Sequence, residues 1–215
     1  MDIAIMAGGP KEFVPFYETL KERHKEAVWF GVDRGVFRLL KNGIVPNEAF
    51  GDFDSVSATE MEWINKKAVS LNVYPQEKNE TDLEIALTEA INRSPDHIYL
   101  YGCTGGRLDH LFANVHLLFK GVENGVDVTI VDRQNQIELK APGTYAVNCT
   151  QGSYFSCIPL SSQVEGLSMS GFKYTLDDHT LTQGTTLCVS NELVENVGRV
   201  TFKEGYLLFM ETVDD

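Results

Sequence analysis

The sequence predicts a chain in two parts, an α/β domain with a mostly parallel sheet followed by an antiparallel β-sandwich. Over the first 131 residues, short apolar runs alternate with helical patterns of about ten to fifteen residues, which is typical of βαβ units. After Asp132 the apolar runs are short, rich in β-branched and aromatic residues, and separated by glycines. This change places the boundary near residues 132–140, and we divide the chain into 1–134 and 135–215.

Short apolar runs and helical spacing locate the elements of the first part. Strands are expected at 2–6, 27–32, 73–74, 97–101 and 126–131. Apolar residues at helical spacing predict helices at 13–20, 36–40, 57–70, 81–93 and 107–119. Turn residues such as Ala7-Gly8-Gly9-Pro10 and Asn42-Gly43 punctuate the pattern.

The helix expected over 107–119 has two apolar faces. The stripe that we expect to pack in the core contains Leu108, Leu111, Phe112, Val115 and Phe119. Ala113 and Leu117 lie opposite, on a face that a monomer would expose and a partner subunit could cover. His110 and His116 lie off the stripe and have no second ligand at metal spacing, so we interpret both as ordinary polar or packing residues.

The second part has the pattern of an antiparallel sandwich or barrel. Its strands are expected at 137–139, 145–147, 154–159, 163–167, 174–176, 185–189, 197–202 and 206–210. Glycines separate them at turn-like intervals: Gly143, Gly152, Gly166, Gly171, Gly184, Gly198 and Gly205.

Composition and charge exclude several classes of protein. The chain has 215 residues, of which 43 % are apolar, enough for a sizeable core. No apolar run approaches the ~18 residues of a membrane span, and the N-terminus has no basic region of a signal peptide. The four cysteines lack metal-binding spacing, which favours reduced thiols in the cytoplasm. A net charge of −13 repels phosphate backbones, so nucleic acid is not an expected partner.

Aspartates occur at strand ends and in loops of the first part, where an open α/β sheet binds its ligands. They are Asp33, Asp52, Asp54, Asp82 and Asp109. In an extended segment, Asp52 and Asp54 would point the same way and Phe53 into the core. Two carboxylates about 4 Å apart repel by ~4 kcal/mol at an effective dielectric constant of 20, which favours a bound cation. Oxygen ligands beside substrate phosphates suit Mg²⁺, although each aspartate alone could be a turn or cap residue.

A glycine-rich segment, Gly102-Cys-Thr-Gly-Gly-Arg107, follows a strand and opens a helix. Its backbone N–H groups would face an anion, and Arg107 adds a two-pronged phosphate donor. The segment is neither a Walker A loop nor the dinucleotide-binding G-x-G-x-x-G. Upstream, Thr81 and Glu84 fit a capping box, so Asp82 could serve the helix dipole as well as a site. Lys78 could contact phosphate or be solvated.

Six segments of the chain resemble the thiamine pyrophosphokinase family, in the family's order. They are Val32-Asp-Arg-Gly35, Gly51-Asp-Phe-Asp-Ser55, Glu77-Lys-Asn-Glu-Thr-Asp82, Gly102-Cys-Thr-Gly-Gly-Arg-Leu-Asp-His110, Gly171-Phe-Lys-Tyr174 and Ser190-Asn-Glu192. The family's Asp-Gly-Gly loop appears here as Asp33-Arg34-Gly35. The resemblance implies an α/β domain followed by a sandwich, a homodimer, and Mg²⁺-dependent transfer of the pyrophosphoryl group of ATP to the thiamine hydroxyl, which leaves AMP.

The resemblance also implies roles for individual residues. Mg²⁺ is expected on Asp52, Asp54 and Asp82. Catalytic roles are expected for Asp54, Asp82, Arg107 and Asp109. Contacts to ATP are expected from Asp33, Arg34, Gly35, Lys78, Thr104, Gly105, Gly106 and Arg107. Thiamine is expected to contact Asp82, Asp109, Ser190 and Asn191, with 1–134 as the catalytic domain and 135–215 as the thiamine-binding domain.

Two other classes of function fit the acidic residues less well. A Mg²⁺-dependent phosphohydrolase could use the same carboxylates, and it would turn over ATP without thiamine. A non-catalytic sensor of nucleotide or thiamine would bind its ligand and leave ATP intact. A sensor has no need of several mutually repelling carboxylates, so the sequence favours the pyrophosphokinase.

Overall fold

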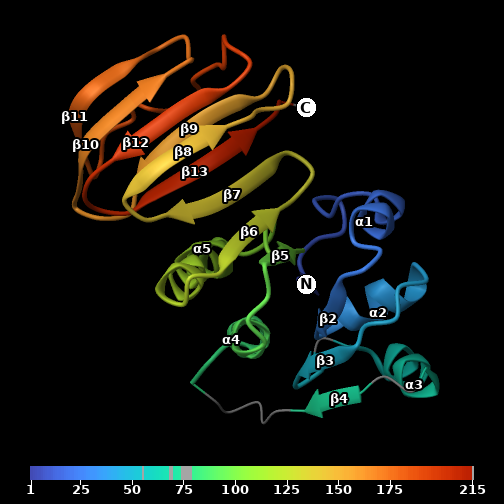
Figure 1. Cartoon of the computed structure of the whole chain (residues 1–215). Coiled ribbons are helices and arrows are strands. Elements are labelled where there is room, and N and C mark those ends of the chain that lie inside the picture. Colours follow the sequence, from blue (N-terminus) through green and yellow to red (C-terminus); the bar gives the residue numbers. More distant parts are fainter. Residues whose placement is uncertain (55, 68–69, 74–78, 215) are drawn as a thin grey trace. The chain divides into compact units, whose positions relative to one another are not determined.

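The computed structural model describes residues 1–54, 56–67, 70–73 and 79–214. The chain divides into two compact units, Met1–Arg133 and Gln134–Asp215 (Figure 1). Lys78, Ser55 and Tyr74, which the sequence analysis singled out, lie outside the described residues. No helix of the described part is long and apolar enough to cross a membrane.

The first unit contains a parallel sheet whose strands pair in the order β4-β3-β2-β1-β5-β6. The strands are β1 (Asp2–Met6), β2 (Val28–Val32), β3 (Glu48–Gly51), β4 (Ser70–Val73), β5 (His97–Tyr101) and β6 (Asp127–Val131). The helices are α1 (Tyr17–Arg23), α2 (Arg34–Lys41), α3 (Ala58–Lys66), α4 (Asp82–Asn92) and α5 (Leu108–Glu123). The predicted α/β class is confirmed.

The chain order reverses in the middle of this sheet. It proceeds outward from β1 through β2, β3 and β4, and then returns to place β5 on the other side of β1. Figure 1 shows α1, α2 and α3 on one face of the sheet and α4 and α5 on the other. In such a sheet, the connections that follow the two strands at the reversal leave toward opposite faces of the sheet, which opens a crevice for ligands at the carboxyl ends of these strands. Here those strands are β1 and β5.

β1 is buried because it lies in the middle of a parallel sheet covered on both faces. Residues Ile3 to Met6 have no exposed surface, as expected for a continuous apolar strand of this kind. Behind the carboxyl end of β5, Nε2 of His24 lies 2.7 Å from the hydroxyl of Tyr101. Burial, with Arg23 nearby, lowers the pKa of His24 to about 4, so the imidazole is neutral at pH 7.

The core stripe expected on α5 is wrong. The buried residues of this helix are Asn114, Leu118 and Gly121, whereas Leu108 and Phe112 are 67 % and 66 % exposed. Gly121 explains the rotation, because a Cβ atom there would lie 2.5 Å from the side chain of Val128 on β6. The glycine lets this face of α5 approach the sheet closely. As a result, the expected stripe faces solvent in the first two turns of the helix.

The other differences in the first unit concern boundaries. The sequence analysis missed β3, a four-residue strand that begins with a glutamate. α1 begins only at Tyr17, α3 ends at Lys66, and α5 continues to Glu123. Ser57 and Glu60 form a reciprocal capping box that fixes the start of α3.

The second unit consists of two antiparallel sheets, as predicted. One has the order β7-β13-β9 and the other β11-β10-β12-β8. The strands are β7 (Asn135–Lys140), β8 (Gly143–Val147), β9 (Tyr154–Pro159), β10 (Gln163–Ser170), β11 (Leu176–Thr182), β12 (Gly198–Phe202) and β13 (Leu207–Thr212). Side chains from both sheets, among them Phe155, Leu167 and Phe202, pack into one core.

Two strand predictions in this unit are wrong. Residues 185–189 form turns, in which Val189 N–H donates to the carbonyl of Thr186 at 3.2 Å. The strand expected at 174–176 begins at its last residue and runs on to Thr182 as β11. β11 lies at a sheet edge and is mostly exposed, so it carries polar residues instead of the apolar pattern that reveals a buried strand.

Candidate functional site

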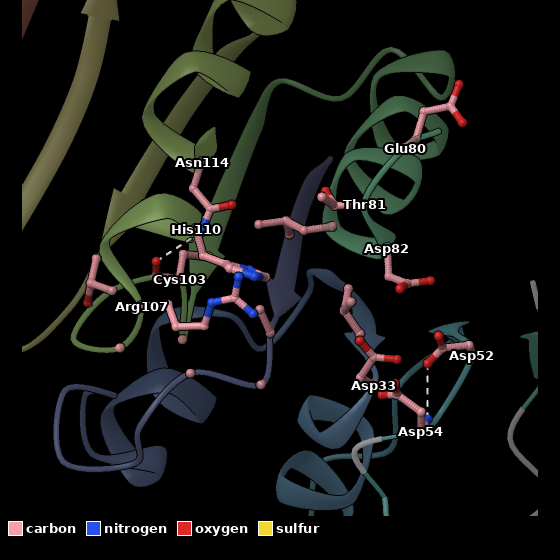
Figure 2. Close-up of a pocket in the computed structure, with 18 residues that line it drawn as sticks. Asp33, Asp52, Asp54, Glu80, Thr81, Asp82, Cys103, Arg107, His110 and Asn114 are labelled. Carbon is pink, nitrogen blue, oxygen red and sulfur yellow. Dashed lines mark hydrogen bonds between the residues drawn. The ribbon is translucent and has the colours of Figure 1, made fainter. Parts of the chain in front are cut away.

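A cavity of about 620 Å³ opens in the first unit at the carboxyl ends of β1, β2, β3 and β5. The amino ends of α4 and α5 also reach it. Figure 2 shows the carboxylates of Asp33, Asp52 and Asp82 on one side, and Arg107, His110 and Asn114 on the other. The cavity therefore lies at the reversal of strand order, where this fold binds its ligands.

Three carboxylates converge at the acidic side of the cavity. Asp33 follows β2, Asp52 follows β3, and Asp82 is the first residue of α4. One carboxylate oxygen from each lies within 4.8 Å of the others. Asp54 was predicted to lie with Asp52 and Asp82, but the structure brings Asp33 into the cluster instead. Asp54 lines the cavity as an exposed residue at the rim.

The extended geometry expected for Asp52-Phe53-Asp54 is wrong. Phe53 has a φ of 59°, which makes the segment a turn, and Asp54 N–H donates to Oδ1 of Asp52 at 3.0 Å. Phe53 is nevertheless buried, as predicted, and it belongs to a hydrophobic core cluster that includes Ala49 and Ile64. The buried ring anchors the turn, and the turn places the Asp52 carboxylate beside those of Asp33 and Asp82.

The backbone around Asp33 is built to place its carboxylate. Asp33 has a φ of 48°, and its N–H donates to the carbonyl of Phe50 at 2.9 Å. Its Oδ1 accepts a bond of 3.3 Å from Phe53 N–H. A Cβ atom at Gly51, where φ is 146°, would lie 2.0 Å from that same oxygen, so only glycine fits. Burial raises the pKa of Asp33 to about 6, and the charge of Asp82 adds to the effect.

Arg34 and Gly35, which were expected to contact ATP, have other contacts in the structure. Arg34 is the first residue of α2, and its guanidinium lies 3.1 Å from a carboxylate oxygen of Glu60. The left-handed residue of this loop is Asp33, so the backbone accepts arginine where the family has its first glycine. A Cβ atom at Gly35 would lie 2.0 Å from the carbonyl oxygen of Met6, so this glycine lets α2 pack on β1.

The glycine-rich loop, residues 102–107, forms the opposite side of the cavity. Gly102 and Gly105 have φ values of 66° and 78°, which glycine adopts without strain. Gly106 and Arg107 line the cavity as expected, whereas Gly105 faces the ring of Phe13. The loop leads directly into α5, whose first N–H groups have no side-chain cap from Arg107.

The sequence analysis took Ala7-Gly8-Gly9 only as a turn, but this segment also lines the cavity. Gly9 N–H donates to the carbonyl of Gly102 at 2.8 Å, which joins the ends of β1 and β5. A Cβ atom at Gly9 would lie 2.4 Å from that carbonyl oxygen. Two consecutive glycines after a buried strand were the available signal.

Arg107 and Asp109 pair with each other at the mouth of the cavity. Both Nε and Nη2 of Arg107 donate to the Asp109 carboxylate, at 3.0 and 2.5 Å. Arg107 thereby lowers the pKa of Asp109 to about 2. The two side chains are 73 % and 62 % exposed, so solvent screens the pair and a phosphate can displace the carboxylate. His110, which we interpreted as an ordinary polar residue, lines the cavity beside them.

Thr104, expected to contact ATP, donates its hydroxyl to Oδ2 of Asp132 at 2.7 Å. Asn114 donates from Nδ2 to the carbonyl of Cys103 at 2.9 Å. Neither Asp132 nor Asn114 was predicted as a site residue. A polar residue at a buried position of α5 could only be recognised once the buried face was known.

Ser190 and Asn191 belong to the second unit. Asn191 is buried, and its side chain bonds both the N–H and the carbonyl of Tyr174, at 3.0 and 2.7 Å. Its backbone also pairs with Phe155. Ser190 is exposed, has a φ of 57°, and donates its N–H to the hydroxyl of Ser156. Asn191 thus organises the loop on which Ser190 is presented.

The two sides of the cavity complement a metal-bound polyphosphate. Clustered carboxylates repel one another unless a hard cation binds between them, and that cation also takes phosphate oxygens as ligands. Glycine N–H groups, a helix amino end and an arginine are donors for the phosphates themselves. The geometry therefore suits phosphoryl or pyrophosphoryl transfer.

Both units match known protein families. Residues 20–130 match the family model "Thiamin pyrophosphokinase, catalytic domain", and residues 135–207 match "Thiamin pyrophosphokinase, vitamin B1 binding domain". The chain is 42 % identical to thiamine pyrophosphokinase of Bacillus subtilis over 213 residues, 99 % of each chain. It is 23 % identical to thiamine pyrophosphokinase 1 of Oryza sativa subsp. japonica over 168 residues, 73 % of this chain and 62 % of the relative.

Solved structures agree with the sequence matches. The crystal structure of the Bacillus subtilis enzyme superposes with a TM-score of 0.94 at 41 % identity and covers all of both chains. That of Geobacillus thermodenitrificans gives 0.91 at 41 %, covering all of this chain and 99 % of the other. The Candida albicans enzyme gives 0.77 at 16 %, covering 99 % of this chain and 89 % of that one, and shows the shared fold alone.

Proposed function

This chain belongs to the thiamine pyrophosphokinase family, and we propose that the cavity of its first unit is where the family's reaction takes place. The chain is an enzyme, a thiamine diphosphokinase. It transfers the pyrophosphoryl group of ATP to the hydroxyl of thiamine and yields thiamine diphosphate and AMP. One observation supports the site above all: three carboxylates face a glycine-rich loop and a helix amino end across a single cavity.

Mg²⁺ is proposed to bind Asp33, Asp52 and Asp82. Three carboxylate oxygens within 4.8 Å of one another are a donor set that this hard cation accepts, with open positions left for phosphates. Burial raises the pKa of Asp33, the negative charge of Asp82 adds to this effect, and both disfavour its ionised form until a cation binds. When bound, the cation would neutralise charge that develops on the transferred phosphates. Asp54, at the rim, is proposed to orient the acceptor hydroxyl together with Asp82 and Asp109.

The phosphates of ATP are proposed to bind the opposite side of the cavity. Gly106 and the first turn of α5 offer backbone N–H groups, and Arg107 offers its guanidinium once the phosphate has displaced Asp109. The displaced Asp109 carboxylate is then available to thiamine, which is a cation. The bond that breaks joins the β-phosphorus to the oxygen that bridges it to the α-phosphate, and this oxygen leaves on AMP. The bond that forms joins the β-phosphorus to the thiamine oxygen, whose proton is released.

The products test this assignment. With thiamine, ATP and Mg²⁺, ³¹P NMR should show the two phosphate signals of thiamine diphosphate and the single signal of AMP appearing together. ADP as the first nucleotide product would point to an ordinary kinase. Turnover of ATP at the same rate without thiamine would point to a phosphohydrolase, and no turnover to a sensor.

The second unit is proposed to supply the thiamine pocket within a homodimer. Each unit exposes apolar side chains that a partner subunit could cover: Leu108 and Phe112 on α5, and Leu187, Val189 and Val194 in the second unit. Val189 and Val194 flank Ser190 and Asn191, so covering these apolar residues would also bring Ser190 to the interface. In this arrangement, the first unit of one subunit meets the second unit of its partner.

A mixing experiment tests the shared site. Asp109→Asn subunits are mixed with subunits in which Ser190 and Asn191 are both replaced by Ala. If both subunits build each site, mixed dimers regain one competent site, and activity appears from two inactive parents. If each site is built within one subunit, mixing restores no activity and the shared-site proposal fails.

The enzyme is proposed to act in the cytoplasm. All four cysteines are free thiols, which is typical of a reducing compartment. Burial raises the pKa of Cys103, beside the cavity, to about 12, so this thiol is unreactive at neutral pH.

A further inference from the structure

Two buried polar side chains hold the middle of the glycine-rich loop. Asn114 on α5 and Asp132 after β6 are each 7 % exposed. Asn114 reaches the loop at the Cys103 carbonyl, and Asp132 reaches it at the Thr104 hydroxyl. The two residues come from different elements, so the loop is held from two directions at adjacent positions. Figure 2 shows the bond from Asn114.

Burying these groups needs a reason. Moving an amide or carboxylate from water into the interior is unfavourable unless the group is hydrogen-bonded there. Asn114 lies on the buried face of α5 with Leu118 and Gly121, where an apolar residue would satisfy packing alone. Asn114 also lines the cavity, so its amide lies between the core and the ligand space. The described bonds of both residues to the loop offset the cost of their burial.

The held positions lie between the two residues of the loop that have the most conformational freedom. Gly102 and Gly105 flank Cys103 and Thr104, and glycine has the largest conformational freedom in the unfolded chain. Fixing the backbone of each such residue costs conformational entropy. If the loop were flexible, part of the binding free energy of ATP would be spent on ordering it. Because Asn114 and Asp132 already hold the loop in the folded protein, ATP binding does not bear this cost.

We propose that Asn114 and Asp132 are positioning residues for the nucleotide, which keep the N–H groups of residues 105–107 in place for phosphate. Neither side chain needs to touch ATP. The proposal rests on the proposed role of the loop as the phosphate site. It predicts that loss of either bond weakens ATP binding and spares thiamine binding.

Steady-state kinetics of the full-length enzyme test the proposal. Asn114→Leu removes the amide at similar volume, and Thr104→Val removes the hydroxyl that Asp132 accepts. Each should raise KM for ATP at least about tenfold and leave KM for thiamine within about twofold, because small displacements of binding groups have effects of this size or more. Calorimetric titration with a non-hydrolysable ATP analogue and Mg²⁺ should show the same loss in Kd.

Thr129→Val is the matched control. Thr129 is buried in the middle of β6, and its hydroxyl lies 2.7 Å from Nε2 of His97, away from the loop. The control loses the same kind of buried hydroxyl, so its Tm should fall by a similar amount while KM for ATP stays near wild type. The proposal is overturned if Thr104→Val changes KM for ATP no more than Thr129→Val does, or if KM for thiamine rises in parallel.

Two further variants keep the test decisive. Asp132→Asn retains an oxygen acceptor and should raise KM for ATP less than Asp132→Leu. If Thr104→Val does not fold, two other variants make the same comparison: Thr104→Ala lacks the hydroxyl and Thr104→Ser keeps it. Arg107→Gln distinguishes the proposed phosphate-binding role of the loop from the proposed positioning role of Asn114 and Asp132. If it leaves KM for ATP unchanged, the loop is not the phosphate site; if it raises KM while the Asn114 and Thr104 variants do not, only the positioning role fails.

Discussion

Asp82→Asn should stabilise the ligand-free protein and disable the enzyme. At the 4.8 Å limit of the cluster, two unit charges repel by about 3.5 kcal/mol at an effective dielectric constant of about 20. The variant loses a favourable charge at the amino end of α4, worth about 0.3–1 kcal/mol. Because the carboxylates are partly solvated, we expect a net gain of about 1–2 kcal/mol in the free energy of unfolding, with turnover lowered at least about a hundredfold.

Denaturant unfolding at pH 7.5 in EDTA measures the gain, and Glu84→Gln is its control. Glu84 lies in the same first turn of α4 but outside the cluster, and its carboxylate is 3.2 Å from Lys120. Removing this charge should destabilise the protein slightly. Added Mg²⁺ should stabilise wild type more than Asp82→Asn, since binding to the folded state adds to its stability. If Asp82→Asn is no more stable than wild type in EDTA, or keeps turnover within about threefold, Asp82 serves only the helix dipole of α4.

Two further predictions concern Gly51 and His24. Gly51→Ala places a Cβ atom against the Asp33 carboxylate, so we expect weaker Mg²⁺ binding by calorimetry and a loss of at least about 1 kcal/mol of stability; unchanged Mg²⁺ affinity would show that Asp33 is not a ligand. His24 has a pKa of about 4 in the folded protein against 6.5 in the unfolded chain, so its contribution to stability is complete above pH 6.5 and is lost as the pH falls to 4. Asp33 acts in the opposite direction, because its pKa of about 6 lets the folded protein bind a proton that the unfolded chain binds only near pH 3.8. The test is therefore the difference in unfolding free energy between wild type and His24→Gln, which should fall by up to about 3 kcal/mol between pH 6.5 and 4; a constant difference would refute the buried neutral histidine.

The sequence could predict those parts of the site that depend on local pattern. The glycine-rich loop before α5 and the cap at Thr81 are continuous in sequence, and the structure has Glu84 N–H donating to the Thr81 hydroxyl as the pattern indicates. Asp33 joins the cluster of carboxylates because β2 and β3 are neighbours in the sheet, which aligns their carboxyl ends. Strand order is a property of the whole fold, so spacing alone grouped Asp54 with Asp52 instead.

The rotation of α5 and the edge strand β11 were missed for a related reason. Apolar residues cover more than one face of α5, and the contact of Gly121 with Val128 decides which face is buried. In β11, an exposed run such as Asp177-Asp178-His179 has no apolar alternation, so pairing with β10 makes the strand. In both cases a tertiary contact outweighs the local signal.

The strand order also determines when the site can exist during synthesis. A chain that has emerged as far as α4 contains Asp33, Asp52 and Asp82, on elements that pair or pack around β1 and β2. The side of the cavity proposed to bind phosphate requires β5, which pairs with the free edge of β1, and then the loop that follows it. A nascent or truncated chain that ends before residue 97 therefore carries the three carboxylates of the proposed metal site without the loop proposed to bind ATP. On this proposal, ATP can add to the stability of the protein only after β5 and that loop have been synthesised.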